Sequence, residues 1–277
     1  MESRSDYVLG HSRQELERLE KQGQFLGRLT RDLLVRAGVG AGMRVLDFGA
    51  GAGDVTLLAA ELVGPEGQVV ALDASAEALS RLRARAAARG LGNIVAVEGD
   101  ESHAATLARP HGFDAVVGRL VLLHQRDPEG ALGRVLDVLR PGGVVAFHEI
   151  EIEAGMWSAP TFPLMEAAFR WIVGAFTHGG MPVDIGRRIA RVFERRGLVD
   201  RKLVREGLLE SGPESLGPEF MANTVRALLP AIVRLGLATA EEVGIDSLAG
   251  RMREAIVAGD LSFVPCYLVG ASARAPM

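Results

Sequence analysis

The segment VLDFGAGAGDVT, from Val45 to Thr56, decides the fold class of this chain. It joins a short apolar run, which ends in Asp47, to a cluster of glycines and then to a helical pattern. Glycines in such a turn adopt positive φ angles and let the backbone approach a ligand closely. A helix that starts directly after the turn offers free backbone N–H groups to polar or anionic ligand atoms. The segment therefore predicts a strand, a ligand-binding turn and a helix in succession.

Five short apolar runs, separated by helical patterns, lie between Met43 and Ile150. They are rich in β-branched residues and nearly continuous in apolar character, which is typical of parallel strands buried on both faces. This alternation predicts an α/β fold with a doubly wound, mostly parallel sheet. The runs are MRVLDF from Met43, QVVALD ending at Asp73, IVAVEGD ending at Asp100, FDAVVGRL from Phe113 and GVVAFHEI from Gly143.

Two of the intervening helices carry start and stop signals. Ser75 begins a helical stretch that Gly90 ends. Asp127, which is followed by a proline suited to the first helical position, begins another. We expect this second helix to end at the PGG turn of Pro141–Gly143, with Leu139 on its apolar face.

Helical patterns also flank the alternating region. A capping box at Ser12 and Glu15 starts a helix that Gly38 ends, and its leucines form an apolar stripe. The stripe must pack on another element, and a homodimer is one way to cover it. After Ile150 we expect the aromatic stretch 151–182, a helix over Asp184–Arg196, a strand over Val199–Arg205, mostly helical structure over Glu210–Asp260 and a last strand over Ser262–Val269.

Composition excludes several classes of function. Lys and Arg total 31 against 35 Asp and Glu, and this acidic balance argues against a protein that binds nucleic acid through phosphate charge. No apolar run is long enough to cross a membrane, and the first residues lack the apolar region of a signal peptide. Cys266 is the only cysteine, and no histidine spacing indicates a metal site. We expect a cytoplasmic protein without nucleic-acid, membrane or metal partners.

In their order, these elements resemble class I S-adenosylmethionine-dependent methyltransferases. The resemblance covers residues 43–150 firmly and the rest of the chain more loosely. A nicotinamide-binding turn would need G-x-G-x-x-G, whereas Asp54 occupies its sixth position and its charge opposes a pyrophosphate. The matching elements are the D-x-G-x-G-x-G loop of Asp47–Gly53, the acid Asp73, the pair Gly99-Asp100, the stretch FDAVVGRLVLLH and LRPGG at Leu139–Gly143.

The resemblance implies a Rossmann-like methyltransferase fold with a seven-stranded sheet, an N-terminal helix and helical lid insertions. We expect residues 1–40 to form an N-terminal lid segment and residues 41–150 the cofactor-binding core. The helical substrate lid would comprise residues 151–182 and 208–260. Residues 183–207 and 261–277 would complete the core sheet.

The implied cofactor is S-adenosyl-L-methionine, with S-adenosyl-L-homocysteine as its product. By the resemblance, the glycine turn lines the methionine and ribose, Asp47 suits the ammonium group, and Asp73 accepts from the ribose hydroxyls. Asp100 would accept from the adenine amino group. The expected cofactor-binding residues are Tyr7, Asp47, Gly49, Ala50, Gly51, Gly53, Asp73, Ala74, Asp100, Glu101, Arg119 and Leu120.

Methyl transfer to a hydroxyl also requires a base, whereas a neutral amine needs mainly alignment. His148 and Glu149, at the end of the fifth run, and His124, after the fourth, are the candidate bases. His124 can instead brace the loop over the cofactor, and alternation turns one of the first two away from the site. We expect an in-line transfer to a hydroxyl or amine of a small, hydrophobic metabolite, as in secondary metabolism.

Aromatic residues after the fifth run can form either the core of a lid or an apolar pocket for the acceptor. His178 can be a surface residue or part of that pocket. The candidate substrate-binding residues are Trp157, Phe162, Phe169, Trp171, Phe176 and His178. Two other functions stay open, namely a protein that binds S-adenosylmethionine without transferring methyl, and a cofactor-assisted cyclase or isomerase.

Overall fold

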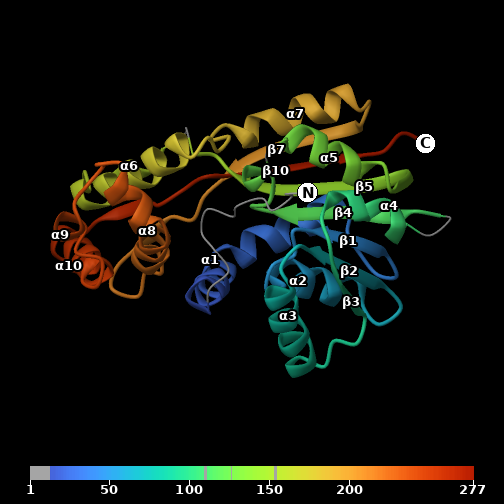
Figure 1. The fold of residues 1–277 in the computed structure, drawn as a ribbon, viewed down its shortest axis with the longest axis horizontal. Helices are drawn as coiled ribbons and strands as arrows, with labels where there is room; N and C mark the ends of the chain where they lie inside the picture. Colours follow the sequence, from blue (N-terminus) through green and yellow to red (C-terminus); the bar gives the residue numbers. More distant parts are fainter. Residues whose placement is uncertain (1–12, 109–110, 126, 153–154) are drawn as a thin grey trace.

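A seven-stranded mixed sheet forms the centre of the molecule (Figure 1). The computed structural model describes residues 13–108, 111–125, 127–152 and 155–277. The first five strands of the chain pair in parallel, and at one side of the sheet a single strand, β10, pairs antiparallel with both of its neighbours, β5 and β7. In spatial order they are β3 (Ile94–Glu98), β2 (Gln68–Asp73), β1 (Arg44–Phe48), β4 (Phe113–Arg119), β5 (Leu139–Ile150), β10 (Leu268–Arg274) and β7 (Val199–Glu206).

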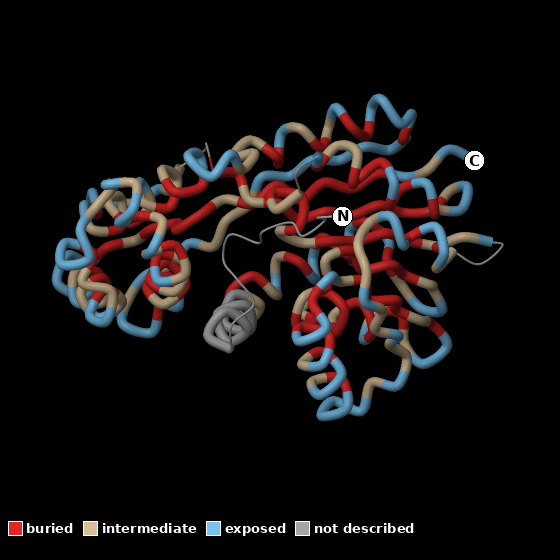
Figure 2. The backbone as a smooth tube through the Cα atoms, in the orientation of Figure 1, coloured by how far each residue is buried: buried red, intermediate tan, exposed pale blue. Residues whose placement is uncertain are grey.

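Helices cover both faces of this sheet, so the expectation of a doubly wound α/β fold is confirmed. Buried residues lie along the central strands and on the inward sides of the helices (Figure 2). One face carries α1 (Arg13–Ala37), α2 (Asp54–Val63) and α3 (Ala76–Ala88). The other face carries α4 (Ala104–Leu107), α5 (Pro128–Leu136) and α7 (Ile185–Arg195).

A second body of helices lies beside the sheet (Figure 1). We call it the helical group; its apolar core also receives Phe25 and Leu26 from α1. A small antiparallel sheet in the order β6-β9-β8 packs with it. The group comprises α6 (Pro163–His178), α8 (Gly217–Arg234), α9 (Ala240–Val243), α10 (Leu248–Gly259), β6 (Trp157–Ala159), β8 (Glu210–Ser211) and β9 (Ser262–Val264).

The part of the apolar stripe of α1 that the structure describes, from Phe25 to Leu34, packs on other elements of the same chain. Leu33 and Leu34 are buried with residues of α2, β1, β4 and β5, whereas Phe25 stacks on Phe220 of α8 at a ring-centroid distance of 4.8 Å. The helix ends where Gly38 takes a φ of 92°, as expected. This described part of the stripe needs no second copy of the chain to cover it, and the homodimer stays a prediction.

Several expected elements differ from the structure. The last strand is two strands in different sheets, β9 and β10, because Pro265 lies between them and cannot donate a ladder hydrogen bond. The helix after Asp127 ends at Leu136, and Leu139 already pairs with Phe113 in the sheet. The small sheet was not expected, because strands of two or three residues leave no periodic pattern.

The start signals of the shorter helices are confirmed. The Ser75 side chain accepts a hydrogen bond from the N–H of Ala78, and the Asp127 side chain accepts one from Gly130. Tyr7 and Ser12 lie outside the described residues. Within the described part of the chain, no helix combines the length and apolar character needed to cross a membrane.

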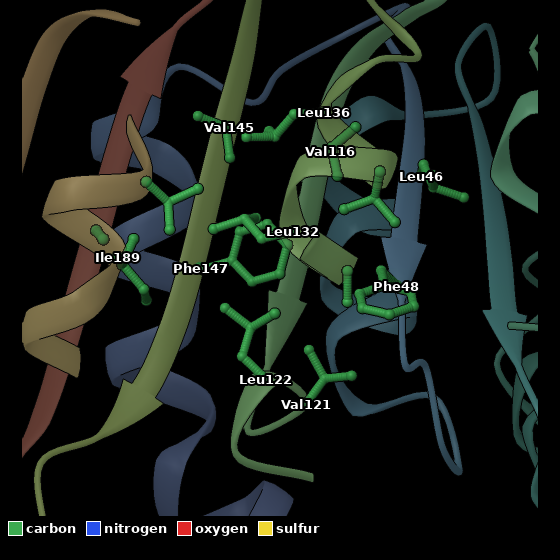
Figure 3. Close-up of a cluster of buried hydrophobic side chains, with 14 of the residues drawn as sticks. Leu46, Phe48, Val116, Val121, Leu122, Leu132, Leu136, Val145, Phe147 and Ile189 are labelled. Carbon is green, nitrogen blue, oxygen red and sulfur yellow. The ribbon is translucent and has the colours of Figure 1, made fainter. Parts of the chain in front are cut away.

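The core between the sheet and the α5–α7 layer depends on Phe147. Its fully buried ring lies among Phe48, Leu122, Leu132 and Ile189 (Figure 3). We predict that Phe147→Ala lowers the free energy of unfolding by about 3–5 kcal/mol, because it removes buried area and leaves a cavity. Urea unfolding measures this change.

The matched control is Val257→Ala on α10, where the side chain is 56% exposed. It should change stability by no more than about 0.5 kcal/mol. A loss below about 1 kcal/mol for Phe147→Ala would contradict its place in the core.

Candidate functional site

Four polar side chains gather at the carboxyl ends of neighbouring strands. Asp47, Asp73, Arg119 and His148 end or nearly end β1, β2, β4 and β5. Alternation along each strand turns all four toward the α1–α2 face, the side on which Val45, Ala71, Val117 and Ala146 are also buried. In open α/β sheets, ligands bind outside these strand ends.

The turn after β1, which we call the glycine loop (residues 49–53), adopts the conformation that its sequence predicts. Gly49, Gly51 and Gly53 have φ angles of 69°, 53° and 93°. A Cβ atom at Gly49 would lie 2.2 Å from a methyl group of Val121, so the loop packs closely on the segment after β4. A Cβ atom at Gly51 would meet nothing within 4 Å. The middle of the loop therefore borders open space.

The Asp73 carboxylate holds the glycine loop in place. One oxygen accepts a hydrogen bond from the N–H of Gly51 at 2.8 Å, and the other accepts one from the N–H of Ser75 at 2.8 Å. A carboxylate has about four acceptor positions. These backbone contacts orient the carboxylate at the strand end next to the loop.

Asp47 lies beneath the loop and is completely buried. Its Oδ2 accepts from the Thr56 hydroxyl at 2.5 Å, whereas its Oδ1 has no hydrogen-bond partner among the described residues. Burial raises the pKa of Asp47 to about 7, against the lowering effects of the Thr56 hydrogen bond and of Arg119. A buried acceptor of this kind suits a cationic or hydrogen-bonding group.

Asp54, the first residue of α2, is held by two arginines. Arg85 lies 2.8 Å from one carboxylate oxygen and Arg119 lies 3.0 Å from the other. Their charges compensate the negative charge that the sequence places at the start of the helix. In the folded protein, the charge of Asp54 therefore repels a pyrophosphate less than the sequence alone predicts.

The residues expected near the adenine lie at the ends of β2 and β3. Ala74 is exposed. Asp100 caps the 3₁₀ helix η1 (Glu101–His103), and hydrogen bonds from Ser102 and His103 lower its pKa. Glu101 pairs with Arg134 of α5 at 2.8 Å.

His148 is enclosed between α1 and β5. Its Nδ1 lies 3.2 Å from the Thr30 hydroxyl, and its Nε2 lies 3.5 Å from Glu206 Oε1. Burial, helped by the charges of Arg119 and Arg36, lowers the pKa of His148 to about 3. The ring is therefore neutral at physiological pH.

Glu149 points to the opposite face and is also fully buried. Its Oε1 accepts from the N–H groups of Val121 and Leu122 at 3.0 and 2.9 Å, while its Oε2 has no partner within the described residues. Burial raises the pKa of Glu149 to about 7, although these backbone hydrogen bonds lower it. Leu120, just before these amides, has a φ of 52°, a strained conformation that is typical of functional sites.

His124 ends η2 (Leu122–His124), the 3₁₀ helix that Glu149 holds, and is half-buried. The three candidate bases therefore occupy three different environments. His148 faces α1, Glu149 faces the backbone of η2, and His124 lies at the end of the same short helix.

The candidate substrate-binding aromatics belong mainly to the core of the helical group. Phe162 and Phe176 are buried there, and Phe169 and Trp171 pack against the same core. Trp157 on β6 is 44% exposed. His178 ends α6 on the surface, where its Nδ1 lies 2.7 Å from the carbonyl oxygen of Gly174.

Several residues at the site escaped the sequence analysis. Thr30 of α1 contacts both Arg119 and His148, and Thr56 contacts Asp47. The sequence indicated only the negative charge of Asp54, whereas in the structure its carboxylate binds both Arg85 and Arg119. Thr56 lies inside the glycine segment and could have been found there, whereas nothing in the sequence indicates which turn of α1 meets the sheet.

Known proteins share this architecture. Residues 40–171 match the family model of a methyltransferase domain. Aklanonic acid methyltransferase DauC of Streptomyces sp. (strain C5) is 37% identical over 128 residues, which cover 46% of this chain and 55% of the relative. Ubiquinone/menaquinone biosynthesis C-methyltransferase UbiE of Pseudomonas savastanoi pv. phaseolicola is 37% identical over 149 residues, 53% of each chain. The chain thus spans about half the length of these curated relatives.

Solved structures agree on the fold. The [4+2]-cyclase SpnF aligns with a TM-score of 0.53 at 20% identity, covering 91% of this chain and 81% of SpnF. Phosphoethanolamine N-methyltransferase 2 of Haemonchus contortus, solved with S-adenosyl-L-methionine, aligns with a TM-score of 0.55 at 19% identity, covering 90% and 53%. The expected Rossmann-like methyltransferase fold is confirmed. Residues 40–171, close to half of the chain, thus match a methyltransferase domain, in agreement with the predicted resemblance to class I S-adenosylmethionine-dependent methyltransferases.

Proposed function

We propose that this protein transfers a methyl group from S-adenosylmethionine to a small, hydrophobic acceptor. The observation that carries the proposal is the convergence of Asp47, Asp73 and Arg119 beside the open glycine loop. A ligand with an ammonium group, a carboxylate and a ribose needs acids, a cation and a closely approachable backbone together. The match of residues 40–171 to a methyltransferase domain supports the same conclusion.

The described residues fit this cofactor. Gly51 borders open space, so the loop can receive a ligand against its backbone. The unpartnered Oδ1 of Asp47 provides an acceptor below the loop, and Asp73 provides a carboxylate oriented for two neighbouring hydroxyls. When bound, the cofactor supplies a methyl group on a sulfonium, which is already activated for transfer.

The protein itself then has to bind the cofactor and the acceptor, orient them toward each other and enclose them. Val121 and Glu149 fix the segment after β4 against the glycine loop, so that Leu120 and the loop keep their relative position. Arg119 places a positive charge at the end of β4, next to α2. Alignment of this kind can contribute about 7–11 kcal/mol to the lowering of a reaction barrier.

Of the candidate bases, we favour Glu149. A base works best when its pKa lies near the working pH, which the raised pKa of Glu149 satisfies and the lowered pKa of His148 does not. The partnerless Oε2 of Glu149 is the atom that would take the proton. His148 and His124 remain candidates from the sequence, and the substrate-binding roles of the aromatics and of His178 remain predictions.

For the acceptor we propose a hydroxyl or amine of a hydrophobic metabolite. A relative named for C-methylation makes carbon a third target to test, and a relative named for aklanonic acid supports secondary metabolism. The apolar core of the helical group, next to the site through α1, supports a hydrophobic acceptor. A cytoplasmic location, a small-molecule partner and the division into core and lid are parts of this proposal.

A second candidate is a cyclase or a non-methylating binder on the same fold. The structural likeness to a [4+2]-cyclase favours including it. Such a protein would bind the cofactor and release no S-adenosylhomocysteine.

Methyl transfer is tested with tritiated S-adenosylmethionine and a panel of acceptors that carry a phenol, an amine or an acidic carbon. We expect label in an apolar acceptor and an equal amount of S-adenosylhomocysteine. Tight cofactor binding without label in any acceptor or in a metabolite extract would favour the second candidate.

Asp73→Ala is expected to weaken S-adenosylhomocysteine binding about 100-fold or more. Two charge-assisted hydrogen bonds would be lost, each worth about 1.5–3 kcal/mol. Calorimetry measures the change, with Glu61→Ala on the surface of α2 as the control. Equal affinity for Asp73→Ala and the wild type would place the ribose elsewhere.

Glu149→Gln is expected to slow single-turnover transfer about 10²- to 10⁴-fold while leaving cofactor affinity within about threefold, because the amide cannot take a proton. The wild-type rate should rise with pH up to about 7, as the raised pKa of Glu149 requires it to lose its proton there. This limb should vanish in the variant. An unchanged rate and profile would rule out Glu149 as the base.

A further inference from the structure

We propose that helix α1 is part of the cofactor site, with Thr30 as the residue that positions Arg119 and Gly23 as the residue that admits Asp54. Docking of α1 and binding of the cofactor would then be one coupled event. The inference rests on the proposed function, since it concerns the same site.

The first observation is a buried polar chain that runs from α2 to α1 and on to β5. Arg119 reaches Asp54 with one nitrogen at 3.0 Å and the Thr30 hydroxyl with another at 3.3 Å. The same hydroxyl lies 3.2 Å from His148 Nδ1. The Arg119 side chain is only 6% exposed, so it has little opportunity to replace these contacts with water.

The Glu206 carboxylate, on the other side of the His148 ring, indicates which group the Thr30 hydroxyl donates to. The Thr30 hydroxyl has one hydrogen, which can go to the Leu26 carbonyl at 3.2 Å or to His148 Nδ1. If the hydroxyl donates to Leu26, the neutral His148 ring carries its proton on Nδ1 and donates to Thr30. The lone pair of Nε2 would then face the Glu206 carboxylate at 3.5 Å, which is unfavourable. In the second case Nε2 carries the proton and lies 3.5 Å from that carboxylate, which is electrostatically favourable although Nε2 makes no hydrogen bond to a described residue. We infer the second arrangement.

Thr30 then has its oxygen lone pairs directed to Arg119. Hydrogen bonds that involve a charged donor are about twice as strong as neutral ones, and a buried charge that loses one is costly to leave unpaired. Without the hydroxyl, the Arg119 guanidinium would keep its hydrogen bond to Asp54 and lose the one to Thr30, so its position would no longer be fixed from two sides. Thr30 thereby sets where the positive charge at the end of β4 lies.

The second observation concerns how closely α1 approaches Asp54 at the start of α2. A Cβ atom on Gly23 would lie 2.3 Å from the Asp54 carboxyl group. That carboxyl cannot easily move aside, because Arg85 and Arg119 both hold it. One turn later, a Cβ atom on Gly27 would meet nothing within 4 Å. Only the first glycine is needed for the helix to pass over the start of α2.

Between these two contacts, Phe25 connects α1 to the helical group by stacking on Phe220. The same two turns of α1 therefore contact three places: Asp54 at the start of α2, Arg119 at the end of β4, and Phe220 of α8. A ligand that orders Arg119 and Asp54 would also fix α1, and a displaced α1 would loosen both.

The test is calorimetric titration of S-adenosylhomocysteine into the full chain and two matched pairs of variants. Gly23→Ala and Gly27→Ala add the same methyl group to the same helix and change helix propensity equally. Thr30→Val removes the hydroxyl at nearly constant volume, whereas Thr30→Ser keeps it. We expect about a tenfold or greater loss of affinity in Gly23→Ala and Thr30→Val. Gly27→Ala and Thr30→Ser should stay within about threefold of the wild type.

Steady-state kinetics separates positioning from a general loss of structure. In Thr30→Val, the KM for S-adenosylmethionine should rise while the KM for the acceptor stays within about twofold, and Thr30→Ser should restore the first value. Wild-type affinity in both Gly23→Ala and Thr30→Val, or equal losses in the two glycine variants, would overturn the inference. A wild type that binds no S-adenosylhomocysteine would instead defeat the proposed function itself.

Discussion

The hydrogen bond from the Gly51 N–H to the Asp73 carboxylate is the contact on which the site depends. It ties the turn after β1 to the end of β2, and the same carboxylate also binds the N–H of Ser75 at the start of α3. Two strands and the following helix are thereby held around one acid. The glycine loop keeps its open side free of side chains because Gly51 has none.

Burial of charge at the strand ends is the second constraint. Burial raises the pKa of both Asp47 and Glu149 to about 7, and it lowers that of His148 to about 3. Each group keeps an orienting contact from a neighbour: the Thr56 hydroxyl, two backbone amides, and the Thr30 hydroxyl. All three groups lie near the carboxyl ends of their strands, Asp47 and His148 on one face of the sheet and Glu149 on the other. The same three side chains therefore contribute to the buried structure at the strand ends and to the proposed site.

Much of this could be predicted from the sequence, because the relevant signals are local. The apolar runs, the Ser75 and Asp127 caps and the glycine turn each depend on a few consecutive residues, and each appears in the structure where it was expected. Asp47 and Asp73 could be placed at the strand ends for the same reason, since each closes one of these apolar runs. The rest depends on contacts between distant residues: Thr30 meets His148 across 118 positions, and β9 finds β6 and β8 through pairings of two or three residues. The aromatics after β5 were equally compatible with a core and with a pocket, since both need apolar side chains at helical spacing; Phe162 and Phe176 are buried in the core.

The most direct test is an experimental structure of the full chain with S-adenosylhomocysteine bound. The account predicts that both ribose hydroxyls lie within hydrogen-bond distance of the Asp73 carboxylate, with the amino-acid part of the ligand along the glycine loop. A ligand found elsewhere in the fold, or a glycine loop closed by the chain's own side chains, would contradict it.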